Sequence, residues 1–217
     1  MIVLIPFLLV CIIPLIVFSV FVLCRKSPNS YGELSSEEMS ASEDYVSSLR
    51  RYLAQKYDVV NYQDPRKIAM LLRLNIVENE ETLAGTEKES VLVKSNDNNF
   101  FGTIVIKQRY MADEEGNARE QNFRICHEIV HYFRDVGPGK RVREAFGRDA
   151  TGVARTHDEQ IVDYMAAALF LPYNEVCTLI KDADKETAKY KLLQSHHLSE
   201  KTIERRVEEV KFLQDLL

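Results

Sequence analysis

The chain has 217 residues, enough for one domain with a sizeable core and some additional segments. Its formal net charge of −5 argues against a dedicated nucleic-acid binder, because such proteins are usually basic. Four cysteines in this length do not suggest a disulfide framework, so we expect free, buried thiols and a reducing compartment.

The first segment, residues 1–24, contains no charged side chain. A helix of this length would measure about 36 Å, enough to cross a hydrocarbon core of about 30 Å with some tilt. The segment lacks a basic region before it and a small-x-small site after it, which favours an uncleaved anchor over a signal peptide. Arg25 and Lys26 follow it, so the positive-inside rule places the remainder in the cytoplasm. The sequence thus predicts a single-pass protein of the cell membrane.

Two further divisions follow this predicted anchor. Residues 25–42 are rich in Ser, Glu, Pro and Asn and predict a flexible linker, which leaves residues 43–217 as the folded domain. Apolar spacing predicts a helix from about Ser42 to Tyr57. Asp64 and Pro65 suit the cap and first position of a second helix.

Short β-type runs at residues 75–77, 90–94 and 100–106 predict a small sheet. An edge strand of such a sheet can pair with an extended peptide substrate. The candidates for this substrate-binding role are Phe101, Gly102 and Thr103. An ordinary internal strand is the alternative interpretation of the same residues.

The motif His-Glu-x-x-His lies in residues 123–133, inside a run with helical apolar spacing. His127 and His131 are four residues apart, so they project from one helix face and can bind the same metal ion. Glu128 is one step round the helix and can reach a water on that metal without being a ligand. Zinc-assisted peptide hydrolysis requires this combination of two nitrogen ligands and a carboxylate base. The alternative is a surface helix with two solvated histidines.

A second helix, predicted over residues 157–171 and ended by Pro172, offers a third ligand. Glu159 can complete the metal site, and Asp163 on the same face can accept a hydrogen bond from the far nitrogen of a ligating histidine. Small residues at 166–168 allow two helices to approach closely. A solvated carboxylate face is the alternative for Glu159 and Asp163, and His157 is a competing third ligand.

Other segments carry weaker signals. Residues 140–155 are basic and either line the cleft, where they could receive an acidic substrate segment, or form a solvated loop. Arg155, His157 and Tyr173 are candidates for contacting the substrate or the oxyanion. Helices are predicted over residues 174–181, over residues 184–195 and after Ser199. Residues 192–206 superficially resemble a helix-turn-helix, but acidic residues crowd the last helix, so we do not expect direct nucleic-acid binding.

The chain resembles the ImmA/IrrE metallopeptidases of bacteria and their mobile elements. The likeness rests on Phe-x-x-x-His-Glu-x-x-His-Tyr at Phe123 to Tyr132 and on Glu-x-x-x-Asp, a small-residue run and Pro at Glu159 to Pro172. It implies an α+β, zincin-like domain with one zinc ion at His127, His131 and Glu159 and with Glu128 as base. It also implies a protein substrate, a helix-turn-helix transcriptional repressor whose cleavage relieves repression.

Two other functions remain open from the sequence. HtpX-like quality-control peptidases of membranes pair the same motif with a Glu-x-x-x-Asp helix, although they carry further membrane spans near it. The other is a non-catalytic module that binds a repressor or DNA through a vestigial site.

Overall fold

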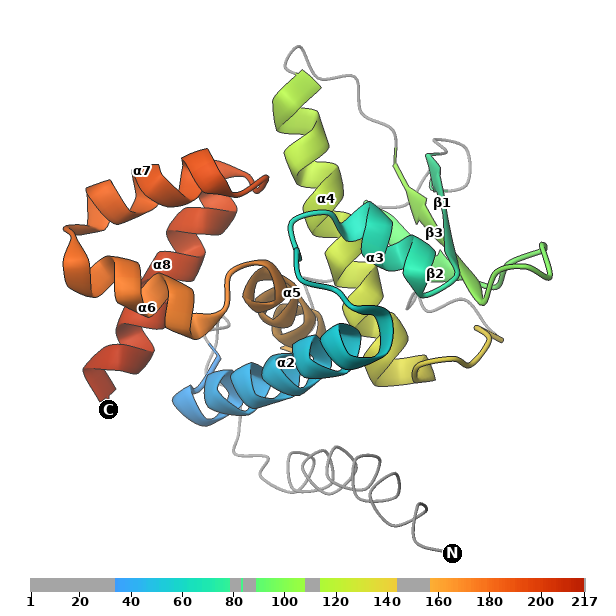
Figure 1. Cartoon of the computed structure of the whole chain (residues 1–217), viewed down its shortest axis with the longest axis horizontal. Helices are drawn as coiled ribbons and strands as arrows, with labels where there is room; N and C mark the ends of the chain where they lie inside the picture. Colours follow the sequence, from blue (N-terminus) through green and yellow to red (C-terminus); the bar gives the residue numbers. More distant parts are fainter. Residues whose placement is uncertain (1–33, 79–82, 84–88, 108–113, 144–156, 217) are drawn as a thin grey trace, which may run out of the picture.

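A computed structural model describes residues 34–78, 83, 89–107, 114–143 and 157–216. The described part is a helix-rich α+β arrangement with a small sheet, as the sequence predicted (Figure 1). The elements are α2 (Ser36–Tyr57), α3 (Pro65–Leu71), β1 (Leu74–Glu78), β2 (Ser90–Val93), β3 (Gly102–Ile106), α4 (Glu114–His131), the π-helix η2 (Tyr132–Val136), α5 (His157–Phe170), α6 (Tyr173–Asp182), α7 (Lys185–Ser195) and α8 (Glu200–Leu216).

The predicted location in a membrane is corrected by the structure. None of the helices in the described ranges is both long enough and apolar enough to cross a bilayer. The segment from which the prediction came, residues 1–24, lies outside the described residues. A single-pass membrane protein is therefore not supported.

The first described helix, α2, begins six residues before the predicted start at Ser42, inside the range predicted as a linker. The reason is a capping box: Ser35 accepts a hydrogen bond from the backbone of Glu38, and the Glu38 side chain accepts one from the backbone of Ser35. Met39 is buried in the first turns, so this end of the helix packs on the core. Local capping therefore outweighs the polar composition of the segment.

The sheet has the order β1-β3-β2, with β1 parallel and β2 antiparallel to the central strand. Gly102 and Thr103 lie in β3, and the backbone carbonyl of the preceding Phe101 already accepts a hydrogen bond from Val142. These candidates belong to an internal strand, which was the alternative interpretation. The edge next to the motif helix belongs to β2, because Ser90 of that strand bonds to Glu128 of α4.

The motif helix α4 lies between the sheet and the helix α5 (Figure 1). Its apolar residues Ile125, Ile129 and Val130 are buried, and Cys126 is a free, buried thiol, as predicted. The helix continues into η2 and stops at Gly137, whose φ of 89° is accessible to glycine at little cost.

Candidate metal centre and peptidase site

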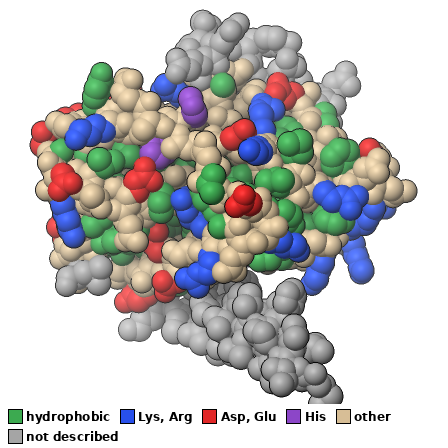
Figure 2. Space-filling view, in the orientation of Figure 1, with side chains coloured by type: hydrophobic (Ala, Val, Ile, Leu, Met, Phe, Trp, Pro, Cys, Tyr) green, Lys and Arg blue, Asp and Glu red, His purple; other side chains and the backbone are tan. Residues whose placement is uncertain are grey.

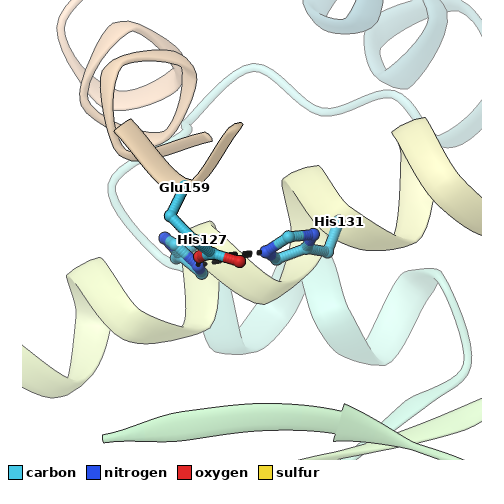
Figure 3. Close-up of side chains that lie close together, drawn as sticks. All are labelled: His127, His131 and Glu159. Atoms are coloured by element: carbon cyan, nitrogen blue, oxygen red, sulfur yellow. Dashed lines mark hydrogen bonds and ion pairs between the residues drawn. The ribbon is translucent and has the colours of Figure 1, made fainter. Parts of the chain in front are cut away.

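Three side chains from two helices converge on one point (Figure 3). His127 Nε2 lies 3.1 Å from Glu159 Oε2 and 3.2 Å from His131 Nε2, and the third side of the triangle, His131 Nε2 to Glu159 Oε2, measures 3.5 Å. Ligand atoms about 2.0–2.1 Å from a tetrahedral zinc ion lie about 3.3 Å from one another. Two imidazoles and one carboxylate are also a donor set of catalytic zinc sites. The triangle therefore fits one zinc-sized ion.

Each imidazole is oriented by a carboxylate on its far side. His127 Nδ1 lies 2.9 Å from Asp163 Oδ1, and His131 Nδ1 lies 2.8 Å from Asp135 Oδ2. A carboxylate in this position holds the proton on Nδ1, which leaves the lone pair of Nε2 free for a metal. The two lone pairs then face each other and an oxygen of Glu159, an arrangement that a cation between them stabilises.

Glu128 is buried, with only 2% of its surface exposed. Its Oε1 accepts a hydrogen bond from the Ser90 hydroxyl at 2.7 Å, whereas Oε2 has no partner among the described residues. Buried polar atoms without partners are rare in folded proteins and often mark a place for water, an ion or a substrate. Glu128 is thus held by one oxygen and has the other free for proton transfer.

The helix α5 packs directly on α4 and carries a run of small side chains. Ala166, Ala167 and Ala168 are all buried in the core. This packing brings Glu159 and Asp163 of α5 within hydrogen-bond distance of His127 on α4. Asp163 is itself 6% exposed, so its bond to His127 is shielded from water.

The charges of the site shift the pKa values of its members in opposite directions. Burial lowers the pKa of His127, but hydrogen bonds to Asp163 and Glu159 and the charge of Glu128 outweigh it and raise the pKa to about 10. Burial likewise lowers the pKa of His131, and its bonds to Asp135 and Glu159 reverse the effect. Hydrogen bonds from both imidazoles hold the pKa of Glu159 well below its usual range. The carboxylates therefore create a strong local demand for positive charge.

Two of the other sequence candidates, His157 and Tyr173, do not join this cluster. His157 bonds to Glu38 of α2 at 2.6 Å, so its imidazole contributes to a helix contact rather than to the triangle. Tyr173, at the start of α6, packs against the hydrophobic core. Arg155 lies outside the described residues. Roles for these three residues in substrate or oxyanion binding remain predictions.

Sequence reasoning missed two members of the site. Asp135 is four residues after His131, and this spacing could have identified it as a partner on the same face. Ser90 is 38 residues before Glu128 and had no signal, because its contact depends on how the sheet packs on α4.

Replacing Asp163 by asparagine is expected to weaken zinc binding by about 10–100-fold, because the amide holds the His127 tautomer less strongly. Competition with a chromophoric chelator measures the dissociation constant. Asp215→Asn, at the exposed end of α8, is the control and should bind zinc as the native protein does. Equal zinc affinity of both variants would contradict the assigned role of Asp163.

The stabilisation of the fold by zinc is expected to grow as the pH rises from about 6.5 to 8.5. His127 has a raised pKa in the metal-free fold. Its protonated imidazole therefore adds fully to the free energy of unfolding below pH 6.5, and this contribution is lost as the pH rises toward about 10. Bound zinc replaces that proton and removes the loss. Melting temperatures of metal-free and zinc-loaded protein at both pH values measure the difference. If the increase in melting temperature on adding zinc stays constant or becomes smaller at the higher pH, the prediction is wrong.

Comparison with known families agrees with this geometry. The chain matches the family described as IrrE N-terminal-like domain, Peptidase_M78, over residues 86–208. This range is more than half of the chain and contains the whole triangle together with Glu128. No curated protein and no solved structure matched. The chain therefore belongs to the IrrE N-terminal-like family, the ImmA/IrrE type of metallopeptidase.

Proposed function

We propose that this protein is a zinc-dependent endopeptidase in which His127, His131 and Glu159 hold one zinc ion. The observation that carries the proposal is the fitting triangle of ligand atoms beside a buried carboxylate, Glu128, with one unsatisfied oxygen. The charge of Glu128 acts on both imidazoles, which places it close to the same point.

The chemistry follows from these positions. Bound zinc would supply Lewis-acid polarisation of the scissile carbonyl and would lower the pKa of a water molecule toward 7. Glu128 takes a proton from the attacking water at Oε2 and passes it to the leaving amine. The Ser90 hydroxyl holds Oε1 and so keeps the free oxygen in one orientation. Asp163 and Asp135 keep the two imidazoles in the tautomer that binds metal.

The backbone of the substrate would pair with the outer edge of β2. Among the described residues this strand pairs with β3 alone, and its first residue touches Glu128. A peptide added to this edge would have its backbone amides satisfied along the strand and would present a carbonyl to the metal site. This assigns to β2 the role that the sequence had suggested for residues 101–103.

The substrate that we propose is a helix-turn-helix transcriptional repressor, by relation to ImmA/IrrE peptidases. Direct action on DNA has little support, because Arg206 of α8 is fully buried and Arg205 is paired with Glu209 at 2.8 Å. These are two of the cations on which a DNA-binding interpretation would depend.

The test uses the full chain and a helix-turn-helix repressor encoded next to its gene. Zinc-loaded protein is expected to cut the repressor into two discrete fragments, and protein stripped with a chelator should leave it intact until zinc is restored. Mass spectrometry of the fragments identifies the bond. Binding of about one zinc per chain with no cleavage of the repressor would reject this substrate, whereas absence of zinc binding would reject the enzyme itself.

A further inference from the structure

A cavity of about 820 Å³ lies beside the metal centre and carries an excess of positive charge. Four of its lining residues are Lys94, Lys140, Arg141 and Arg143, and among the described residues Asp135 is the one acidic side chain that lines it. We refer to it as the basic cavity. Figure 2 shows Lys and Arg side chains gathered on the side of the molecule that carries the sheet, although the whole chain has a net charge of −5.

The positive charge of the basic cavity is not neutralised by neighbouring carboxylates. None of its four cations forms an ion pair within the described ranges, and Arg141 instead donates to the side chain and carbonyl of Asn98. Asp135 is already engaged by His131 and by Arg134, at 2.8 Å from each. Uncompensated cations beside a partly enclosed apolar surface favour an anionic ligand.

The loop that carries three of these cations is fixed to the core next to the motif. The buried Tyr132 donates a hydrogen bond from its hydroxyl to the carbonyl of Lys140 and accepts one from the amide of Gly139, both at 3.0 Å. The amide of Val142 donates to the carbonyl of Phe101 at 2.7 Å. The cations therefore sit on an anchored segment of backbone.

The basic cavity and the catalytic carboxylate lie at opposite ends of one strand. Ser90 at the start of β2 contacts Glu128, whereas Lys94, just after the end of β2, lines the cavity. Four steps along a strand cover about 13 Å. Asp135 of η2, just after the motif helix, lines the cavity and also bonds to His131. An extended peptide on β2 whose scissile bond lies at Glu128 therefore reaches the cavity about four residues away.

We propose that the basic cavity binds an acidic segment of the protein substrate, with Asp or Glu about three to five residues to one side of the cut bond. This proposal rests on the proposed peptidase function. The aliphatic walls formed by Val136 and Val142 suit the methylene groups of a glutamate, with the cations positioned for its carboxylate.

A binding experiment separates this site from the chemistry. The probes are two fluorescein-labelled twelve-residue peptides, one with four glutamates and one with glutamines at the same positions. Full-length protein with Glu128→Gln is used so that neither peptide is cut. The glutamate peptide is expected to bind about tenfold more tightly at low salt, and the difference should shrink as salt is added. Equal affinity for both peptides, or no measurable binding of either, would overturn the proposal.

Charge reversal provides the second arm. Lys94→Glu with Lys140→Glu should abolish the preference for the glutamate peptide, and a lysine version of the peptide should then bind best. Both side chains are exposed, so the fold should be retained, which a melting curve checks. Lys201→Glu with Lys211→Glu makes the same change of charge on exposed positions of α8 and should keep the native preference. A loss of preference in both double variants would show a general charge effect and would also overturn the proposal.

The position of the acidic residue is tested by cleavage. Zinc-loaded native protein acts on a defined mixture of synthetic peptides, and the cut sites are found by mass spectrometry. Enrichment of Asp and Glu three to five residues from the cut bond supports the assignment, and its absence overturns it. Absence of any zinc-dependent cut would reject the peptidase function, while the binding arm would still decide whether the cavity selects acidic peptides.

Discussion

Glu128→Gln is expected to bind zinc as the native protein does and to lose about 10²–10⁴-fold of its cleavage rate. The change is nearly isosteric. The amide oxygen can still accept the hydrogen bond from Ser90, so the side chain should keep its place. The amide nitrogen that replaces Oε2 has no lone pair with which to take a proton from water. Initial rates of repressor cleavage and zinc content per chain measure the two effects separately.

The matched control for Glu128 is Glu120→Gln on the same helix. Glu120 pairs with Arg124 at 3.1 Å near the surface, where removing one charge costs little. We expect its cleavage rate to stay within about twofold of native, because Glu120 is not one of the residues of the metal centre or of the basic cavity. If Glu128→Gln cuts the repressor at a native rate, the assignment of Glu128 as the base is wrong, whatever the zinc content of the variant.

The motif helix illustrates how much of the site the sequence contains. The spacing of His127 and His131 is local, so helical geometry alone predicts that their imidazoles lie together. Glu159 is 32 residues from His127, and only the residue types on the second helix suggested the contact that the structure shows. Asp163 followed from the same argument, because it is one turn after Glu159 and faces the same helix.

The parts that could not be predicted depend on packing between distant segments. The order of strands in the sheet is not encoded in any one strand, so the internal position of β3 and the edge position of β2 emerge only in the fold. The contact between Ser90 and Glu128 follows from that order. The basic segment was ambiguous between a cleft wall and a solvated loop, and the bonds of Tyr132 to residues 139 and 140 decide its place.

Arg206 is another residue whose environment depends on packing between distant segments. It belongs to the segment that superficially resembles a helix-turn-helix, but its side chain is completely buried. Its guanidinium donates to Glu43 of α2 and, through Nε at 2.9 Å, to the carbonyl of Leu171 after α5. It also lies 5.0 Å from the centre of the Tyr164 ring, and the Tyr164 hydroxyl donates to the same carboxylate of Glu43 at 2.7 Å. One cation thus ties the C-terminal helix to the helix that carries Glu159.

Arg206→Ala is therefore expected to destabilise the fold by about 3–5 kcal/mol, because it leaves the carboxylate of Glu43 buried without its cation and opens a cavity at the helix junction. Lys211→Ala on the same helix removes an exposed cation and should cost at most about 1 kcal/mol. Urea unfolding of zinc-loaded protein measures both free energies of unfolding. Because the penalty comes from the stranded charge, adding Glu43→Gln to Arg206→Ala should recover part of the loss. Equal stability of Arg206→Ala and Lys211→Ala would mean that Arg206 does not hold the C-terminal helix against the metal-binding helix.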